Sequence, residues 1–375
     1  MVTPAGAGPI RDRQVELFGY RAHIAPWLLD EVGRIVADAA PSHSIVVITD
    51  DQVAPLHVPA VVGSLRHFLP QVRTLVRSVA SGEQHKTRES WIALTDWMIG
   101  ERCGRDTTIV ALGGGVVGDL AGFVAATFMR GVPLVQCPTS LLAMVDASVG
   151  GKVGVDTPAG KNLVGAFHQP HAVIVDPTVL QTLSPAHRRA GLAEVIKHGI
   201  IADAEYLSRT LAIGPALVAG ASIEWHGAVL VDLIARSVEL KANVVREDER
   251  EGGIRQILNF GHTMGHAIEA ASGYTLLHGE AVAIGMALES ALAERLRIAE
   301  PGTHECVVEA LQTVGLPTSR PPAIAPRAML DLMRRDKKVR AGRIAFALPL
   351  RIGAMAVSHG RYGIEVPETD ILAAL

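Results

Sequence analysis

TTIVALGGGVVGDLAGF, residues Thr107 to Phe123, is the stretch that decides the fold of the first half of this chain. It opens with a short, apolar, β-branched run, which predicts a strand buried on both faces of a parallel sheet. A glycine-rich loop and then an apolar helix follow. Glycine lets the backbone approach a pyrophosphate, and a helix N-terminus supplies free N–H groups. Strand, loop and helix together predict an α/β unit with a nucleotide site.

The loop satisfies the pattern G-x-G-x-x-G but lacks one feature of the usual dinucleotide fold. The ribose-binding acid expected about 20 residues further on would fall in Val132–Pro138, which contains none. Two upstream acids, Asp50 and Glu83, are the candidates for that role. Asp50 follows the apolar run Ser44–Thr49, and open α/β sheets bind ligands at the carboxyl ends of such strands. We therefore expect a nucleotide site in a different α/β architecture.

Two more predicted strands lead into polar segments. Val72–Val79 precedes the polar turn Ser81–Lys86, which would equally suit an ordinary helix start. Val132–Cys137 leads to a glycine-rich segment that carries Lys152 and Lys161. The glycines predict a backbone that turns repeatedly. Two lysines in such a loop favour phosphate binding, with solvated surface lysines as the alternative.

Length and composition indicate two domains and exclude several classes of protein. The 375 residues exceed a typical single core, so we expect an α/β domain at 1–183 and a mostly helical domain at 184–375. A formal charge of -3 argues against a nucleic-acid partner. The most membrane-like run, Thr107–Met129, contains several glycines and Asp119, which disfavours a membrane span. Three scattered cysteines indicate reduced thiols and a cytoplasmic protein.

The second half contains a histidine-rich stretch, RQILNFGHTMGHAIEAASGYTLLHGE, at Arg255–Glu280. His262 and His266 lie one helical turn apart, and His278 precedes the next predicted helix. The spacing partly matches the zincin pattern HExxH, but its glutamate is missing, so a metal would need a carboxylate from elsewhere. A satisfied or surface histidine pair remains an equal alternative on spacing alone.

Charged residues on predicted helices supply the remaining candidates. A helix that starts at Ser184–Pro185 carries Glu194, the best candidate for the missing carboxylate, and Lys197. Lys241 lies on an apolar helix stripe, where it needs an anionic partner unless its stem extends to solvent. The charged run Asp331–Arg340 would be solvated or would close over a phosphate.

Eight motifs in order along the chain resemble the 3-dehydroquinate synthase family. They are SGEQHK (Ser81–Lys86), GGGVVGDLAGF (Gly113–Phe123), PTSLLAMVDASVGGK (Pro138–Lys152), GKNLVGAFHQP (Gly160–Pro170), AEVIKHG (Ala193–Gly199), LNFGHTMGHAIE (Leu258–Glu269), HGEAVAIGM (His278–Met286) and DKK (Asp336–Lys338). The resemblance implies an N-terminal nucleotide-binding α/β domain, a mostly α-helical C-terminal metal-binding domain and a cytoplasmic homodimer. Two departures are Ser140 and Val153, where threonine is more usual.

The resemblance also implies the role of each site residue. The ligands of a zinc or cobalt ion would be Glu194, His262 and His278, so that His266 faces the substrate. Arg255 and Lys241 would hold the substrate carboxylate, and Asp146 and Lys197 the ring hydroxyls. The phosphate would lie among Lys152, Asn162, Asn259, His266 and one of Lys337 and Lys338, with Arg130 reaching in from the partner subunit. NAD would contact Asp50, Glu83, Lys86, Gly114, Gly115, Val116, Gly118, Asp119, Thr139, Ser140, Lys152, Lys161 and Thr182.

The chemistry implied is the conversion of 3-deoxy-D-arabino-heptulosonate 7-phosphate, a sugar acid phosphate, to 3-dehydroquinate and phosphate. Transient oxidation by NAD acidifies a neighbouring C–H, phosphate is eliminated, the hydride returns, and an aldol addition closes the ring. Alternatives are a sister cyclase of the valiolone or inosose type and a metal-dependent glycerol-type alcohol dehydrogenase. A catalytically silent binding protein is a third alternative. The cations Arg255 and Lys241 favour a substrate that carries a carboxylate.

Overall fold

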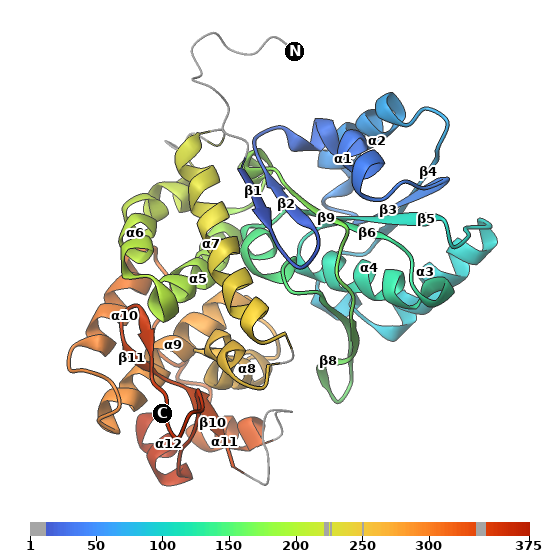
Figure 1. Ribbon diagram of the computed structural model, residues 1–375. Coiled ribbons are helices and arrows are strands. Elements are labelled where there is room, and N and C mark those ends of the chain that lie inside the picture. Colours follow the sequence, from blue (N-terminus) through green and yellow to red (C-terminus); the bar gives the residue numbers. More distant parts are fainter. Residues whose placement is uncertain (1–12, 221–224, 226, 250, 335–342) are drawn as a thin grey trace. The chain divides into compact units, whose positions relative to one another are not determined.

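The structure is a computed structural model that describes residues 13–220, 225, 227–249, 251–334 and 343–375 (Figure 1). These residues divide into two compact units. The first lies within Met1–Leu183 and Glu224–Glu239, and the second within Ser184–Ile223 and Leu240–Leu375. The segment Glu224–Glu239 therefore belongs to the first unit, whereas the sequence predicted a single boundary after residue 183. Among the described helices, none has both the length and the apolarity needed to cross a bilayer.

The first unit is built on a seven-stranded sheet in which every neighbouring pair is parallel except β1 and β2. The strands, in spatial order, are β1 (Arg13–Glu16), β2 (Arg21–Ile24), β9 (Ala172–Val175), β6 (Leu134–Pro138), β5 (Thr107–Gly113), β3 (Ser44–Asp50) and β4 (Arg73–Val79). All seven residues of β5 are buried, because the strand lies near the middle of the sheet with helices on both faces. The strands predicted from apolar runs are confirmed.

Four helices cover this sheet, two on each face. In Figure 1, α1 (Val32–Ala39) and α2 (Ala54–Phe68) lie on one face and α3 (Arg88–Gly100) and α4 (Gly115–Thr127) on the other. The chain passes from β3 outward to β4 and then returns to place β5 on the other side of β3. The carboxyl ends of β3 and β5 therefore flank a topological switch point, where open α/β sheets bind ligands.

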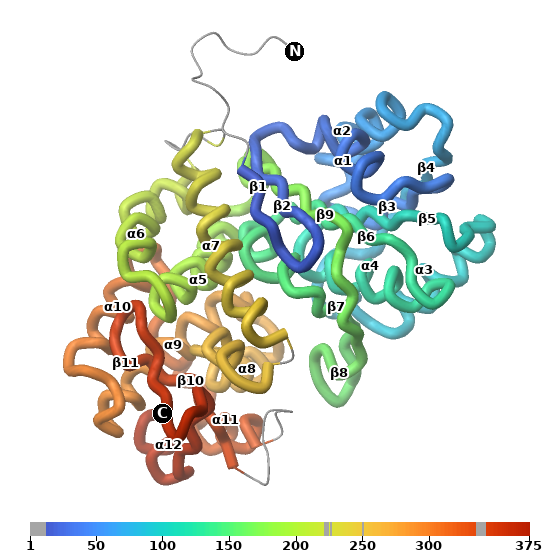
Figure 2. The backbone as a smooth tube through the Cα atoms, in the orientation of Figure 1, coloured from blue at the N-terminus to red at the C-terminus, as the bar shows by residue number. Residues whose placement is uncertain are grey.

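The glycine-rich segment after β6 is ordered differently from the expected turning loop. Residues Lys152–Thr157 (β7) and Gly160–Phe167 (β8) form an antiparallel hairpin that extends away from the sheet (Figure 2). Gly154 and Gly165 face each other, and a Cβ on Gly165 would lie 2.4 Å from the Val153 carbonyl oxygen. The prediction of repeated turns holds at Gly150, Gly151 and Gly160, which have positive φ, but was wrong at Gly154 and Gly165, which serve close strand contact.

The second unit is mainly helical. Its helices are α5 (Pro185–Ala202), α6 (Ala204–Ala219), α8 (His262–Ala271), α9 (His278–Arg295), α10 (Thr303–Thr313), α11 (Pro326–Arg334) and α12 (Glu368–Ala374), and α7 (Ala228–Glu247) begins in the first unit and ends in the second. Ser184 caps α5 as its sequence predicts, since its side chain accepts from the His187 N–H. Residues 343–375 contribute four short strands. There β11 (Pro349–Arg351) pairs with β12 (Ala354–Met355), whereas β10 (Ala345–Ala347) pairs with β13 (Gly363–Glu365).

Short helices connect these elements. The 3-10 segments are η1 (Leu28–Glu31), η2 (Glu83–His85), η3 (Phe128–Arg130), η5 (Pro177–Gln181) and η6 (Ile254–Asn259), and η4 (Ala143–Ala147) is π-helical. Helices α8 and α9 pack with their backbones in close contact. A Cβ on Gly285 would lie 1.9 Å from the Gly261 carbonyl oxygen, so α9 must carry glycine there. The first turn of α8, which holds His262, is thereby pressed onto α9.

Candidate functional site

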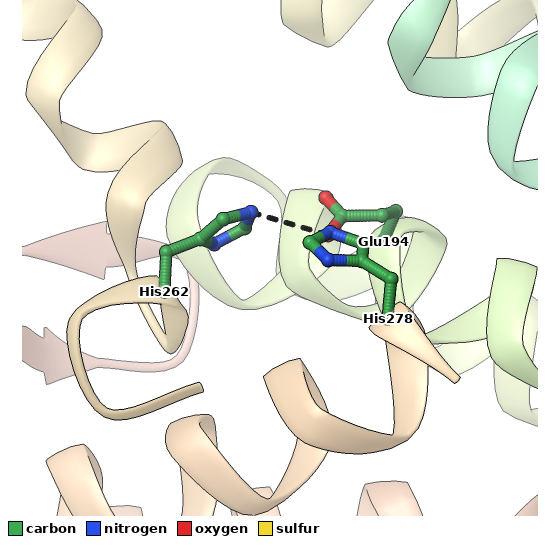
Figure 3. A group of neighbouring side chains, drawn as sticks. All are labelled: Glu194, His262 and His278. Atoms are coloured by element: carbon green, nitrogen blue, oxygen red, sulfur yellow. Dashed lines mark ion pairs between the residues drawn. The ribbon is translucent and has the colours of Figure 1, made fainter. Parts of the chain in front are cut away.

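Three side chains of the second unit converge from three helices (Figure 3). Glu194 lies in the middle of α5, whereas His262 and His278 are the first residues of α8 and α9. The Nε2 atoms of His262 and His278 lie 3.6 and 3.8 Å from Glu194 Oε1. Ligand atoms bound tetrahedrally at about 2.1 Å from a zinc ion are separated by about 3.4 Å, so the spacing suits a single divalent ion.

The surroundings of Glu194 support the same conclusion. Its side chain is fully buried, and neither carboxylate oxygen accepts a hydrogen bond within the described residues. Lys197, one turn along α5, forms an ion pair with Oε2. The Lys197 ion pair offsets part of the cost of burying this carboxylate, and a cation bound beside Oε1 would offset more of it. The donor set of one carboxylate and two imidazoles is one that zinc accepts.

Both histidines are oriented through their other ring nitrogen. His262 Nδ1 lies 3.2 Å from the Phe260 carbonyl oxygen, and His278 Nδ1 lies 3.4 Å from Glu269 Oε2. An N–H donated at Nδ1 leaves Nε2 with a free lone pair towards Glu194. The His266 ring centroid is 5.3 Å from that of His262, but His266 is outside the three-residue cluster. The i,i+4 pair therefore does not supply both imidazoles; His278 supplies the second.

The predicted carboxylate-binding cations also lie in the second unit. Arg255 and Lys241 are buried, with 3% and 7% of their surface exposed, so Lys241 does not extend to solvent. Asp248 accepts from the backbone N–H groups of Gly252, Gly253 and Arg255 and so shapes the turn before η6. The Arg255 guanidinium donates to the Glu249 carbonyl oxygen.

Asn259 lies at the end of η6, four residues after Arg255. Its amide donates to Glu251 Oε1 at 2.6 Å, and Glu251 itself has a positive φ of 61°. A non-glycine residue in that region is strained and recurs at functional sites. Arg255, Asn259 and Glu251 are therefore held together by one turn whose geometry is set by Asp248.

In the first unit Lys86 is the centre of a cluster of five charged residues. The Lys86 ammonium lies 2.9 Å from Glu83, 3.1 Å from Asp119 and 3.7 Å from Asp156, and Lys161 lies 3.3 Å from Glu83. The structure thus brings together four residues predicted for NAD and adds Asp156. They come from η2, α4, β7 and β8, beside the carboxyl end of β5.

The pKa values within this cluster are set by burial and by the lysines. Burial raises the pKa of Asp119 to about 6, against the attraction of Lys86. Burial also acts on Glu83, but Lys86 and Lys161 outweigh it and hold the Glu83 pKa below its ordinary value. Burial opposes the charge of Lys86, yet the three carboxylates keep its pKa above the ordinary range.

Some glycines of the segment Gly113–Gly122 are required by packing, and others are not. A Cβ on Gly122 would lie 2.3 Å from the Val153 side chain, and one on Gly118 would lie 2.8 Å from Gln136. A Cβ on Gly114 or Gly115 would meet only ordinary contacts, at 3.5 and 3.4 Å. Both glycines lie at the N-terminus of α4, where the first N–H groups have no intrahelical partner. A pyrophosphate bound at this backbone would account for glycine at positions 114 and 115.

Several other predicted residues of the first unit lie at or after the carboxyl ends of strands or on the hairpin, whereas Arg130 lies between the end of α4 and the start of β6, at the opposite edge of the sheet. Asp50 ends β3 and accepts from the Gln52 and Val53 N–H groups; Thr139 and Ser140 follow β6 directly. Thr182 accepts from or donates to His57 Nε2 at 3.1 Å. Lys152 and Asn162 are exposed on β7 and β8, Asp146 is in η4, and Arg130 is exposed in a turn with positive φ. Lys337 and Lys338 lie outside the described residues.

Four residues with roles at these sites were missed by sequence reasoning: Asp156, Asp248, Glu251 and Glu269. Glu269 could have been found, because it lies seven residues after His262 on the same helix and therefore on the same face. Asp248 and Glu251 are in a charged stretch before two glycines, which is typical of a tight turn. Asp156 gives no local signal, since it reaches Lys86 only through the β7–β8 hairpin.

Comparison with known proteins now identifies the family. A family described as 3-dehydroquinate synthase N-terminal matches residues 76–190, and 3-dehydroquinate synthase C-terminal matches residues 191–339. A 3-dehydroquinate synthase from Desulforamulus reducens is 42% identical over 365 residues, which cover 95% of this chain and 96% of that protein. The chain belongs to the 3-dehydroquinate synthase family. It is thus an enzyme of the sugar phosphate cyclase kind, as the sequence motifs predicted.

Solved structures confirm the predicted 3-dehydroquinate synthase-like fold. A 2-epi-5-epi-valiolone synthase from Streptomyces hygroscopicus, with NAD+ and Zn2+ bound, has a TM-score of 0.84 and 28% identity and covers 97% of this chain and 98% of its own. A 2-deoxy-scyllo-inosose synthase complexed with carbaglucose-6-phosphate, NAD+ and Co2+ has a TM-score of 0.86 at 24% identity, with the same coverage. At 24% identity, the 2-deoxy-scyllo-inosose synthase structure shows only that the fold is shared.

Proposed function

We propose that this chain is a 3-dehydroquinate synthase that converts 3-deoxy-D-arabino-heptulosonate 7-phosphate to 3-dehydroquinate and phosphate, a carbon–oxygen lyase reaction of the shikimate pathway. The observation that carries the proposal is the convergence of Glu194, His262 and His278 in a chain of this family. A cytoplasmic homodimer is part of the same proposal, and the mass of the purified protein in solution tests whether it is a dimer.

Two groups would be held by the residues described. Glu194, His262 and His278 would hold zinc or cobalt, and the α4 N-terminus with the Lys86 cluster would hold NAD. When bound, the metal supplies Lewis acidity at a substrate hydroxyl and the nicotinamide accepts and returns a hydride. The solved valiolone synthase structure contains NAD+ and zinc, and the solved inosose synthase structure contains NAD+ and cobalt.

The chain's own residues would bind and orient the substrate. Arg255 and Lys241 would pair with its carboxylate, and Lys197 and Asp146 would position ring hydroxyls. The phosphate would lie among Lys152, Asn162, Asn259, His266 and one of Lys337 and Lys338, with Arg130 of the partner subunit. Fixed cations at the leaving phosphate stabilise the charge that develops there without reorganising during the reaction.

A sister cyclase is the main alternative. The 42% identity to a 3-dehydroquinate synthase, against 28% to the valiolone synthase, favours the first activity. The buried cations Arg255 and Lys241 support it as well, because a neutral sugar phosphate would provide no carboxylate for them.

The test is phosphate release from two substrates in the presence of NAD+. We expect turnover of the heptulosonate phosphate and little or none of sedoheptulose 7-phosphate, which lacks the carboxylate. Absorbance at the NADH band should not rise at steady state, because the hydride is returned and no NADH accumulates. Equal turnover of both sugars would favour a valiolone-type cyclase, and stoichiometric NADH would favour an alcohol dehydrogenase.

A further inference from the structure

The first turn of α8 lacks a cap from its own sequence. Helix α8 begins at His262, and its N-cap residue is Gly261, with a φ of 78° and no side chain that could accept a hydrogen bond. The N–H groups of a first turn have no intrahelical acceptor, and burying them without a partner costs stability. An acceptor must therefore come from another part of the chain.

Glu289, on α9, supplies that acceptor with both oxygens. Its Oε2 accepts from the Gly261 N–H at 2.7 Å, and its Oε1 accepts from the Met264 N–H at 3.0 Å. Glu289 is fully buried. A carboxylate at a helix N-terminus makes charge-assisted hydrogen bonds and interacts favourably with the helix dipole. Glu289 thus replaces the capping side chain that Gly261 cannot provide.

The contact is rigid because the two backbones touch directly beside it. Gly285, one turn before Glu289 on α9, lies against the Gly261 carbonyl oxygen, and a Cβ on Gly261 would lie 2.4 Å from the Met286 side chain. His262 is positioned between Gly261 and Met264, the two residues whose N–H groups Glu289 binds. A displacement of this turn would move the His262 imidazole relative to Glu194 and His278.

We propose that Glu289 is a positioning residue for the metal centre: its carboxylate fixes the first turn of α8 and with it the His262 ligand. The inference rests on the proposed metal site. It differs from a purely structural role, because loss of Glu289 should weaken metal binding more than an equally destabilising change elsewhere. Groups that orient metal ligands typically change metal affinity by about 10- to 100-fold when removed.

The test uses a control on the same helix. Glu294 of α9 accepts from the His304 N–H at 2.8 Å, in the first turn of α10, which carries no candidate site residue. Full-length Glu289→Ala, Glu289→Gln and Glu294→Ala proteins are stripped of metal. Their melting temperatures are measured without metal, and their Zn2+ dissociation constants by competition with a chromophoric chelator. Visible absorption of the Co2+-loaded proteins reports the ligand geometry.

We expect Glu289→Ala to weaken Zn2+ binding by about 10- to 100-fold and to alter the Co2+ bands. Glu289→Gln keeps the side-chain shape, so it should fold even if the alanine variant does not. It retains one acceptor oxygen and should weaken binding by about tenfold. Glu294→Ala should lower the melting temperature with wild-type affinity and spectrum.

Wild-type Zn2+ affinity in Glu289→Gln, or an equal loss of affinity in Glu294→Ala, would overturn the positioning role. A wild-type protein that binds neither Zn2+ nor Co2+ would instead overturn the metal site on which the inference rests. The two failures are therefore distinguishable from the same set of titrations.

Discussion

Glu194 is fully buried. Lys197 forms an ion pair with its Oε2 atom, and the imidazoles of His262 and His278 face its Oε1 atom. Glu194→Gln removes the charge that attracts a cation but keeps the side-chain volume. We expect metal content, measured by elemental analysis of the purified protein, to fall in Glu194→Gln and in His278→Ala. His266→Ala should retain its metal while losing turnover. An empty site in His266→Ala together with a full one in His278→Ala would contradict the ligand assignment.

Arg255 is the residue on which substrate choice depends. Its planar guanidinium can pair with both oxygens of a carboxylate, which an ammonium cannot do. Arg255→Ala should lower kcat/KM for the heptulosonate phosphate by roughly two to three orders of magnitude, since losing such a pair costs about 3–4 kcal/mol. Arg255→Lys should recover only part of this. Undiminished kcat/KM in the alanine variant would place the carboxylate elsewhere.

Asp119 gives a pH-dependent contribution to stability whose sign follows from its pKa of about 6 in the folded protein. Above that pH the carboxylate is ionised in both states, and burying the charge disfavours folding. Below it the folded protein takes up a proton that the unfolded chain does not bind until its ordinary pKa, near 3.9. The wild type should therefore gain stability relative to Asp119→Asn as the pH falls from 7 to 4. Urea unfolding of both proteins measures this difference, which should not exceed about 3 kcal/mol. A difference independent of pH would show that Asp119 does not titrate in this range.

At the scale of elements, the N-terminus of α4 distinguishes a ligand requirement from a packing requirement. Gly114→Ala meets only ordinary contacts and needs no unusual φ, so its melting temperature should stay near that of the wild type. NAD+ affinity, measured by calorimetry, should nevertheless fall about tenfold or more, because a methyl group would occupy the path of the pyrophosphate. Gly122→Ala, which would clash with Val153, should instead unfold at lower temperature. Wild-type NAD+ affinity in Gly114→Ala would move the cofactor away from α4.

Elements with a strong local pattern could be predicted from the sequence, and those that depend on distant contacts could not. The β5–loop–α4 unit and the Ser184 cap of α5 follow from apolar runs, glycines and a capping serine. The β7–β8 hairpin was missed because its glycines also suit turns, and only the facing strand shows that Gly154 and Gly165 serve contact. Val153, where the family more usually has threonine, is buried against Gly122.

The residues of the candidate site likewise fall into those that the sequence could predict and those that depend on distant contacts. The metal ligands could be proposed from motifs of the family, whereas spacing alone offered His262 with His266 and left a satisfied or surface histidine pair as an equal alternative. The supporting carboxylates Glu251 and Glu289 could not be derived, because each acts on a residue that only the folded chain brings near it, whereas Glu269 could have been found from its helix face. Periodicity shows which face of a helix is buried, but not which backbone N–H a buried glutamate will reach.

For the whole molecule, a metal held by Glu194, His262 and His278 would link three helices that are separate in the sequence, α5, α8 and α9. A ligand that binds only the folded state stabilises it by about 2.7 kcal/mol when its free concentration is 100 times its Kd. Zn2+ should therefore raise the melting temperature of the metal-free protein, and a chelator should reverse the effect. Glu194→Gln should show a much smaller rise. If Zn2+ does not change the melting temperature of the wild-type protein, the result would argue against a metal site that joins these helices.

The strand order also determines when strand β2 can reach its final place during synthesis. Strand β2 pairs with β9, and Ile24 is opposite Val175, which the ribosome adds 151 residues later. At roughly 5–20 residues per second, translation covers that interval in about 8–30 s. Until then the β1–β2 hairpin has an unpaired edge, which nascent chains must protect from other polypeptides. Chaperones that hold the emerging N-terminus should therefore matter more for the yield of this protein than those acting on its helical second unit.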